Sequence, residues 1–368
     1  MSGTADTQRR FFSVLEGLRG VAAILVMLRH IAPYVYPIRF QESYLAVDLF
    51  FILSGAVIAN SYERILLSGG MSFRVFVTLR LIRIIPLYLL GSAIGIVAMI
   101  ADGSQALHKV MLFAVLGLVM MPCPLPGTVL YPLNHPAWSL FFEFVANFFY
   151  AKFIRNLSDK NIAIIIVLSF VLLLIGVFSF GMALDLGWTR RTFIFGVPRV
   201  MFSFFMGVLI YRCAIKESSI KIRLGARSAM AALICSVIVL AAPVGPIYES
   251  FYCVTAIVVV FPLLILLSIF VTVSGFLDKF MRILGELSFP LYVLHAPLFS
   301  IAAAIYGSFL ERYLPFSGWL FSVLAISVSL LVHFCLDLPF RRFLRGVLIG
   351  PKNQMEGVLV ADNSGRVS

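Results

Sequence analysis

Long, continuously apolar runs alternate with short polar segments along most of the chain, and residues 162–180 are one such run. A helix needs about 20 apolar residues to cross the hydrocarbon core of a bilayer, and these runs approach or reach that length. Strands of a transmembrane barrel would alternate apolar and polar positions, which these runs do not do. The pattern therefore predicts an all-α fold, a polytopic bundle of transmembrane helices.

Ten apolar segments are expected to cross the membrane, and eleven crossings are the alternative. The ten are residues 12–35, 44–61, 84–101, 133–154, 162–180, 193–211, 228–243, 252–274, 284–306 and 317–338. Residues 110–121 are too short to cross directly, so a re-entrant or half-length element is expected there, on the outer side. Residues 1–349 are predicted to form one integral-membrane domain, and the polar residues 350–368 a disordered cytoplasmic tail.

Composition agrees with this class and also indicates the orientation. The chain has 368 residues, of which 61% are hydrophobic, with a mean hydropathy of +1.03 and a net charge of +12. The basic residues lie mainly in short loops between apolar runs, so they are interpreted as positive-inside signals rather than as a nucleic-acid surface. The basic loops 152–160, 212–227, 279–282 and 341–352 and both termini are therefore expected on the cytoplasmic side.

Three ionisable residues in the first apolar run carry the first candidate site. Glu16 and Arg19 are three positions apart, and Arg19 and His30 differ by only about 20° around a helix. Charged groups inside a membrane are costly, so this face is expected to point toward the protein interior and to be functional. A structural ion pair between helices is the alternative.

Two further runs carry polar residues that are expected to line a substrate site. Asp48 shares a face with Gly55, and close helix packing at that glycine was expected to bring Asp48 to the first span, as a counter-ion for Arg19 or in a direct catalytic role. Ser139 and Glu143 share another face. Glu143 is a candidate for orienting an imidazole or binding an acceptor hydroxyl. Ser139 is not favoured as a nucleophile, because the chain has no G-x-S-x-G turn.

Arg80 and Arg83 form a two-pronged cationic site on a helix expected to lie near the membrane surface and to turn inward at Pro86. Guanidinium groups suit phosphate oxygens, so an anion or phosphate clamp is predicted, with plain positive-inside charge as the alternative. Tyr292 and His295 lie on one polar face of a later run and are predicted to line the substrate site.

No metal site and no disulfide framework are predicted. The five cysteines are scattered without paired spacing. The remaining histidines are isolated in the sequence: His108, His135 and His333.

Six stretches in this order resemble the bacterial membrane acyltransferase-3 family, which O-acylates carbohydrates outside the cell. They are EGLRG with Arg19 and His30, VDLFFILSG, Arg80-x-x-Arg83 followed by IIPLY, AWSLFFEF, SFPLYVLH and DLPFRR, and they extend over residues 13–342. Two positions depart from the family pattern but keep its charge: Glu16 replaces the usual aspartate, and Asp337 the usual glutamate.

The resemblance implies an O-acetyltransferase of the bacterial inner membrane without a permanently bound cofactor. Arg19 and His30 would be required for activity, with His30 as general base, and Arg80 and Arg83 would bind the donor, acetyl-CoA. The acceptor would be an envelope or exported carbohydrate or a lipid-linked oligosaccharide. A secondary transporter of a small polar solute is the main alternative, because buried charges and broken helices also occur in transporters. A non-catalytic membrane scaffold is the third.

Overall fold

The structure is a computed structural model that describes the backbone of residues 3–181, 183–216 and 224–361 and the side chains of 13–181, 183–214 and 224–349. The described chain is helical. Its α-helices are α1 (Gly3–His30), α2 (Ala46–Ser68), α3 (Phe73–Asp102), α4 (Leu107–Leu118), α5 (Ala137–Phe153), α6 (Asp159–Phe180), α7 (Gly196–Lys216), α8 (Ala226–Ala241), α9 (Pro246–Thr255), α10 (Phe261–Ile269), α11 (Gly275–Arg312), α12 (Phe316–Val332) and α13 (Leu338–Ala361).

Shorter helical segments complete the described chain. The 3-10 segments are η1 (Ala32–Tyr34), η2 (Gln41–Leu45), η3 (Ile154–Asn156) and η4 (Phe193–Phe195), and the π-helical turns are η5 (Ala256–Val260) and η6 (His333–Asp337). Among the described residues, β-pairing is limited to one isolated bridge between Leu224 and Val271. The predicted all-α class is therefore confirmed.

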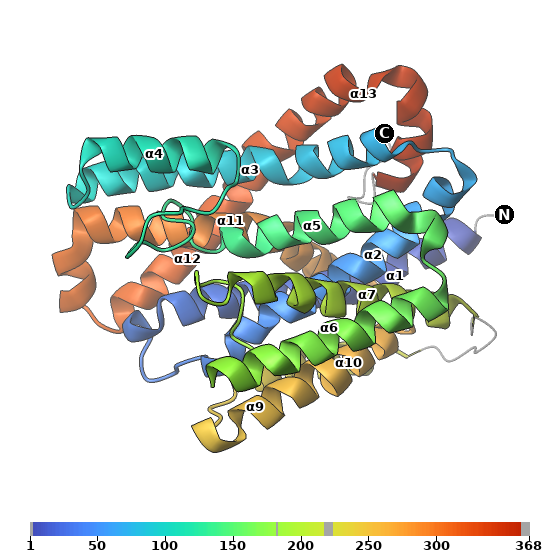
Figure 1. Ribbon diagram of the computed structural model, residues 1–368, viewed down its shortest axis with the longest axis horizontal. Helices are drawn as coiled ribbons and strands as arrows, with labels where there is room; N and C mark the ends of the chain where they lie inside the picture. Colours follow the sequence, from blue (N-terminus) through green and yellow to red (C-terminus); the bar gives the residue numbers. More distant parts are fainter. Residues whose placement is uncertain (1–2, 182, 217–223, 362–368) are drawn as a thin grey trace.

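The helices form an elongated bundle in which most of them lie along the long axis (Figure 1). Helix α11 packs against α1, α3 and α12, while α7 packs against α2 and α6. Seven helical stretches within the described residues are long and apolar enough to cross a membrane: Gln41–Ser68, Phe73–Asp102, Asp159–Phe180, Phe193–Ala214, Pro246–Ile269, Gly275–Arg312 and Phe316–Ile349. All seven coincide with expected crossings, so the chain is a polytopic membrane protein.

The total of ten crossings stays a prediction. The three expected crossings outside the group of seven correspond to α1, α5 and α8, of which α5 has 17 residues and α8 has 16. Helix α4, which covers most of the expected half-length element, has 12 residues. The domain boundary at 349 and a disordered tail also stay predictions, since α13 is described to Ala361 and residues 362–368, with the C-terminus, lie outside the described residues. The N-terminus lies outside them too.

Helix α3 differs from the expected arrangement around Pro86. The sequence was interpreted as a surface helix that carries Arg80 and Arg83 and turns inward at Pro86, but α3 is one helix of 30 residues through all three positions. Proline is tolerated inside membrane helices because neighbouring groups satisfy the backbone that it frees. Arg80 is consequently buried inside the bundle rather than lying at its surface.

Helices α1 and α11 run parallel in a constant register, and two glycines permit their close contact. A Cβ on Gly20 would lie 2.5 Å from the backbone oxygen of Leu284, and one on Gly285 would lie 2.5 Å from the Cβ of Glu16. At the start of the contact Ser13 donates a hydrogen bond to Asp278, 265 positions away. At its far end His30 meets His295, also 265 positions away.

Helices α2 and α7 are also held together by facing glycines. A Cβ on Gly55 would lie 1.9 Å from the carbonyl oxygen of Phe204, and one on Gly207 would lie 1.9 Å from that of Ile52. Small residues at such a crossing allow two backbones to approach, which is a common basis of helix association in membranes. The close approach predicted at Gly55 is therefore present, but its partner is α7 and not α1.

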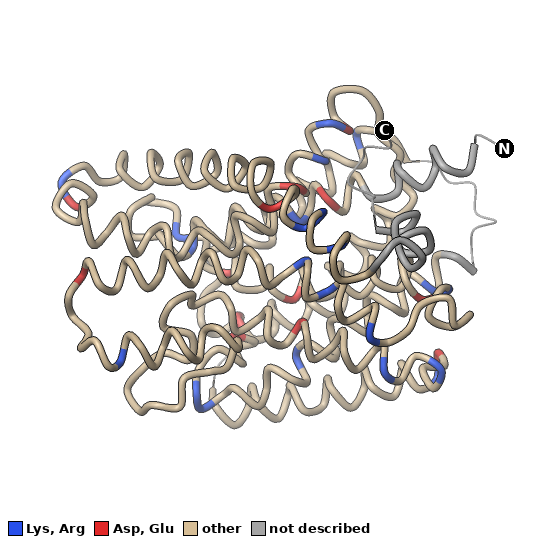
Figure 2. The backbone as a smooth tube through the Cα atoms, turned by 90° about the horizontal axis from the view of Figure 1, so that it is seen from above, with Lys and Arg blue, Asp and Glu red and all other residues tan. Residues whose placement is uncertain are grey.

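One end of the bundle gathers basic segments that are distant in sequence. Arg212 donates hydrogen bonds of 2.9 Å to Glu63 and Asp159, which joins the ends of α2 and α7 to the start of α6. Lys and Arg are also more frequent in the half of the molecule that holds α13 (Figures 1 and 2). Several of the basic loops that the positive-inside rule assigns to one side of the membrane therefore lie together at one end of the bundle.

The α2–α7 contact yields a stability prediction. Gly207→Ala is expected to lower the thermal midpoint of the detergent-solubilised protein, because the new methyl group meets a backbone carbonyl that cannot rotate away. Overpacking of this kind costs about 1–3 kcal/mol. Gly307→Ala is the matched control, since a Cβ at Gly307 would enter open space. Equal midpoints for the two variants would contradict this account of the packing.

Candidate active site

A cavity of about 710 Å³ opens inside the bundle between α1, α2, α3, α5, α11 and α13. Along α11 its lining extends from Gly275 to Tyr292, which is about 25 Å of helix. Eight cationic side chains line it (Arg19, Arg80, Arg83, Lys279, Arg282, Arg341, Arg342 and Arg345), against four acidic ones (Glu16, Glu143, Asp278 and Glu286). The cavity is long, enclosed by helices and electropositive, which suits an elongated anionic ligand.

Glu143 orients one of the predicted arginines inside this cavity. Its carboxylate accepts hydrogen bonds of 2.9 Å from Arg80 Nη2 and from Ser54 Oγ. The interpretation that Glu143 orients an imidazole is therefore wrong, because the carboxylate faces α3 and α2. Arg80 Nε is buried without a hydrogen-bond partner among the described residues, so this arginine keeps a donor for a ligand.

Arg83 faces the cavity in a different way. Its guanidinium carbon lies 5.9 Å from the centre of the Phe289 ring, and that of Arg341 lies 5.6 Å from the same ring. Within the described part of the chain, no hydrogen bond or ion pair joins Arg19 or Arg83 to a carboxylate. Two half-buried cations without direct counter-ions favour the binding of an anion.

The C-terminal helix adds cations that the sequence analysis assigned only to topology. Asp337 accepts hydrogen bonds from Arg341 Nε at 2.7 Å and from His333 Nδ1 at 3.1 Å. Both partners line the cavity. The signal that could have found them is the spacing of Arg341, Arg342 and Arg345, since residues three and four apart share a helix face.

A pair of buried hydroxyl groups closes the end of the cavity that is farthest from Lys279. Ser139 Oγ and Tyr292 Oη lie 2.6 Å apart, and Ser139 Oγ lies 3.0 Å from the carbonyl oxygen of Pro136. Both residues line the cavity, one from α5 and one from α11, and their contact with a substrate stays a prediction. They mark the point where the lining of the cavity ends on α11.

Three histidines meet one helical turn beyond this hydroxyl pair. His30 Nδ1 lies 3.3 Å from His295 Nε2, and the ring centre of His135 lies 6.1 Å from that of His30. His295 is buried and His30 is exposed. None of the three lines the cavity, so the predicted pair of Arg19 and His30 is divided between the cavity and this cluster.

Backbone carbonyl groups set the tautomers of the paired histidines. His30 Nδ1 lies 2.8 Å from the carbonyl oxygen of Val26, and His295 Nδ1 lies 2.9 Å from that of Leu291. A carbonyl can only accept, so the proton of each ring is on Nδ1. Nε2 of His30 then carries a free lone pair, as a general base requires.

His135 was considered isolated, and the structure corrects this. It lies in the loop before α5, where it contacts both His30 and the Trp188 ring, whose centre is 5.4 Å away. Among the described residues, no group of three His, Cys, Asp or Glu side chains is arranged to hold a metal ion.

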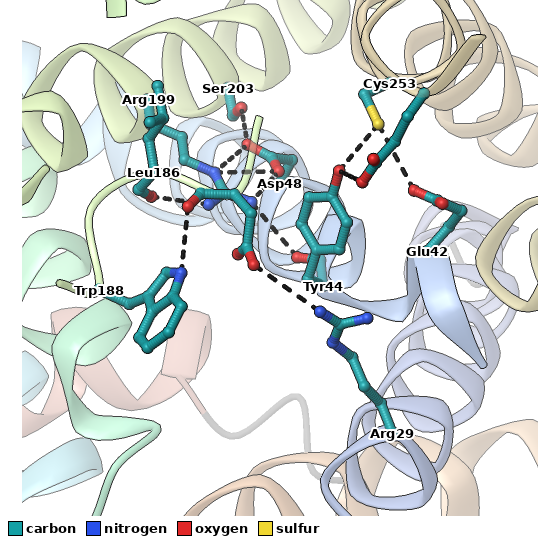
Figure 3. A network of polar contacts seen from close by, with 11 residues as sticks. Arg29, Glu42, Tyr44, Asp48, Leu186, Trp188, Arg199, Ser203 and Cys253 are labelled. Carbon is teal, nitrogen blue, oxygen red and sulfur yellow. Dashed lines mark hydrogen bonds and ion pairs between the residues drawn. The ribbon is translucent and has the colours of Figure 1, made fainter. Parts of the chain in front are cut away.

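Asp48 belongs to a separate network of buried polar contacts (Figure 3). Arg199 Nη2 donates to the Asp48 carboxylate at 2.6 Å, and Ser203 Oγ donates to it at 3.2 Å. Arg199 Nη1 also donates to the carbonyl oxygen of Leu186 at 2.8 Å. Asp48 is completely buried and does not line the cavity. The expected pairing with Arg19 is therefore wrong, because the contact at Gly55 places Asp48 against α7.

The sequence of this chain is similar to known proteins. Residues 12–338 match the acyltransferase-3 family, described as an acyltransferase domain. The chain belongs to the acyltransferase-3 family. Protein 2 in picA locus of Rhizobium radiobacter is 35% identical over an alignment of 189 residues, which covers 46% of this chain and 96% of that protein. No solved structure matches the chain.

Membership of the acyltransferase-3 family identifies the protein as a membrane acyltransferase of the O-acyltransferase type. The transporter alternative is not favoured. The arginine-lined cavity, the hydroxyl pair and the exposed histidine together form the candidate active site.

The Asp48–Arg199 pair yields a prediction that separates a structural role from a substrate-lining role. Arg199→Met is expected to reduce the amount of folded protein severely, because an uncompensated buried carboxylate costs about 3–5 kcal/mol. In the double variant Asp48→Leu/Arg199→Met both charges are gone, so folded protein should largely return. Size-exclusion chromatography and thermal midpoints measure both outcomes. A double variant that folds well but has lost all activity would show that the pair does more than hold α2 on α7.

Proposed function

We propose that the protein transfers an acetyl or other short acyl group from cytoplasmic acyl-CoA to a hydroxyl of an envelope or exported carbohydrate. O-antigen, exopolysaccharide and lipochitooligosaccharide are the acceptor classes, in free or lipid-linked form. The observation that carries the proposal is the arrangement along α1 and α11. A cationic cavity ends at a hydroxyl pair, and an exposed imidazole with a free lone pair lies one turn farther on.

The cavity supports acyl-CoA as the donor. Coenzyme A carries several phosphate groups, and guanidinium groups bind phosphate oxygens with directed hydrogen bonds. Arg83 and the unpartnered Nε of Arg80 supply such donors in the cavity, and Lys279 and Arg342 add positive charge near its other end. The length of the cavity along α11 suits a ligand with an anionic head and a long, narrow acyl-bearing arm.

The histidine cluster supports a carbohydrate hydroxyl as the acceptor. His30 Nε2 would take the hydroxyl proton as the oxygen attacks the acyl carbon, while the Nδ1 contact to Val26 holds the ring in place. Arg19 lies eleven residues earlier, about 16 Å along the helix, where it would stabilise negative charge on the donor. The positive-inside rule assigns the basic end of the bundle to the cytoplasm, and with it both termini, in a bacterial inner membrane. His30 would then face outward.

Vesicles that contain the purified protein test this function. Labelled acetyl-CoA on the side of the basic loops and an oligosaccharide on the other side are expected to yield labelled oligosaccharide. His30→Ala should abolish the product without changing insertion, because His30 is the exposed imidazole of the cluster and the neighbouring His295 is buried. Intact labelled acetyl-CoA in the opposite compartment without acylated product would favour transport. Product formed only when both reactants share the side of the basic loops would contradict the proposed orientation.

The donor site yields a second test. Arg83→Ala is expected to weaken acyl-CoA binding tenfold or more, because a hydrogen bond to a charged group contributes about 1.5–3 kcal/mol and 1.4 kcal/mol is tenfold. Arg74→Ala is the matched control, since Arg74 is exposed on the same helix outside the cavity. Titration of acyl-CoA into each purified variant, followed calorimetrically, gives the affinities. Equal affinities of the Arg83→Ala and Arg74→Ala variants would contradict donor binding by Arg83 and leave it as a positive-inside charge.

A further inference from the structure

The hydroxyl pair at the end of the cavity has an ordered chain of hydrogen bonds. Ser139 Oγ can donate its single proton to the Pro136 carbonyl oxygen at 3.0 Å, which leaves Tyr292 to donate to Ser139 Oγ at 2.6 Å. Tyr292 Oη is farther from the Pro136 oxygen, at 3.4 Å. Both side chains are largely buried at this end of the cavity. The direction of the hydrogen bond between Ser139 and Tyr292 can reverse when the two hydroxyl groups rotate, without movement of heavy atoms.

Acyl transfer from a thioester requires a donor at this position. Attack of the acceptor oxygen turns the carbonyl oxygen into an oxyanion, and donors aimed at that oxygen contribute strongly to the rate. In the first turn of α5, Ala137 N donates to the carbonyl oxygen of Asn134 and Ser139 N to that of Pro136. Backbone N–H groups farther inside the helices are used within them. Asn134, the nearby amide, donates to the carbonyl oxygen of Val293 at 3.0 Å. By the register of α1 on α11, Arg19 lies level with Leu284, about two turns before Tyr292.

We propose that the Tyr292 hydroxyl is the oxyanion donor of the active site and that Ser139 is its positioning residue. The inference rests on the proposed function. When the acyl carbonyl reaches the pair, Ser139 donates to Tyr292 Oη, and Tyr292 turns its own proton to the carbonyl oxygen. A hydroxyl that accepts one hydrogen bond becomes a better donor of the next, so the chain strengthens the contact as negative charge develops.

In the proposed acyl transfer, each bond that forms is matched by one that breaks. His30 Nε2 takes the proton of the acceptor hydroxyl, the C–O bond forms, and the carbonyl electron pair moves to the oxygen held by Tyr292. The C=O bond then re-forms, the C–S bond breaks, and its electron pair leaves on sulfur. The sulfur receives the proton that His30 had taken. The products are the acylated carbohydrate and free coenzyme A.

Ser139 is poorly placed to be the nucleophile itself. A serine nucleophile needs a base within hydrogen-bond distance, and its oxygen lies beside a tyrosine hydroxyl and a backbone carbonyl. The nearest buried histidine, His295, already contacts the Leu291 carbonyl oxygen and His30. Acyl transfer is therefore direct in this geometry, with no acyl-serine.

Tyr292→Phe tests the assignment, since it removes the hydroxyl and keeps the ring that packs edge-on against Phe50. The expected result is a fall in kcat of about 10²–10³-fold, the usual loss for one oxyanion donor, with acyl-CoA affinity changed less than threefold. Tyr252→Phe is the matched control, because it also removes a hydroxyl that donates to a backbone carbonyl, that of Val239 at 2.8 Å, far from the cavity. It should keep the kcat of the unaltered protein.

If Tyr292→Phe does not fold, a second pair of variants, at Ser139, tests the oxyanion assignment. Ser139→Ala is expected to lower kcat by about tenfold through lost preorganisation, and Ser139→Thr, which keeps a hydroxyl, to restore most of it. Intact-mass spectrometry after exposure to acyl-CoA without acceptor should find no acyl adduct on the protein. An adduct on Ser139 would overturn the assignment in favour of a covalent route.

The outcomes separate this inference from the function on which it rests. If the unaltered protein and Tyr252→Phe form no acylated carbohydrate, the proposed function fails. If both form it and folded Tyr292→Phe matches their kcat within threefold, only the oxyanion assignment fails. A Tyr292→Phe defect confined to acyl-CoA affinity would likewise overturn the assignment and make Tyr292 a donor-binding residue.

Discussion

The parallel packing of α1 on α11 is the constraint on which the active site depends. Gly20 and Gly285 let the two backbones approach so closely that a single methyl group at either position would collide with the facing helix. The resulting register is the same at both ends of the contact, from Ser13 beside Asp278 to His30 beside His295. A shift of one residue would turn the two histidines apart, because each residue rotates a helix by about 100°.

This register also divides the chemistry between two compartments. The cationic residues of α1 and α11 line a cavity that ends near Tyr292, and the paired histidines lie beyond that residue, with His30 exposed. A ligand with several negative charges and an uncharged ligand need different environments. The bundle provides both within about 30 Å of α11, from Gly275 to His295. Between α2 and α7 the Asp48–Arg199 ion pair neutralises its own charges.

Much of the site could be predicted from single helices. Arg19, Arg80, Arg83, Ser139 and Tyr292 were identified because polar residues stand out in apolar runs, and all five line the cavity. Their partners could not be predicted in this way. The sequence has no local signal that Glu143 faces Arg80 instead of a histidine, that Asp48 faces Arg199, or that His135 reaches His30, because each contact joins elements far apart along the chain.

The sequence by itself determined the helical membrane class, the approximate helix positions and the polar face of each helix. Those properties follow from the period of the helix and from the cost of exposing backbone to lipid, which act on every segment independently. Only the tertiary structure decided which polar faces meet. That choice depends on rotation and register between helices, and here the small residues set both: Gly55 and Gly207 turn α2 toward α7, and Gly20 and Gly285 join α1 to α11. The two histidines become a pair only through that second contact.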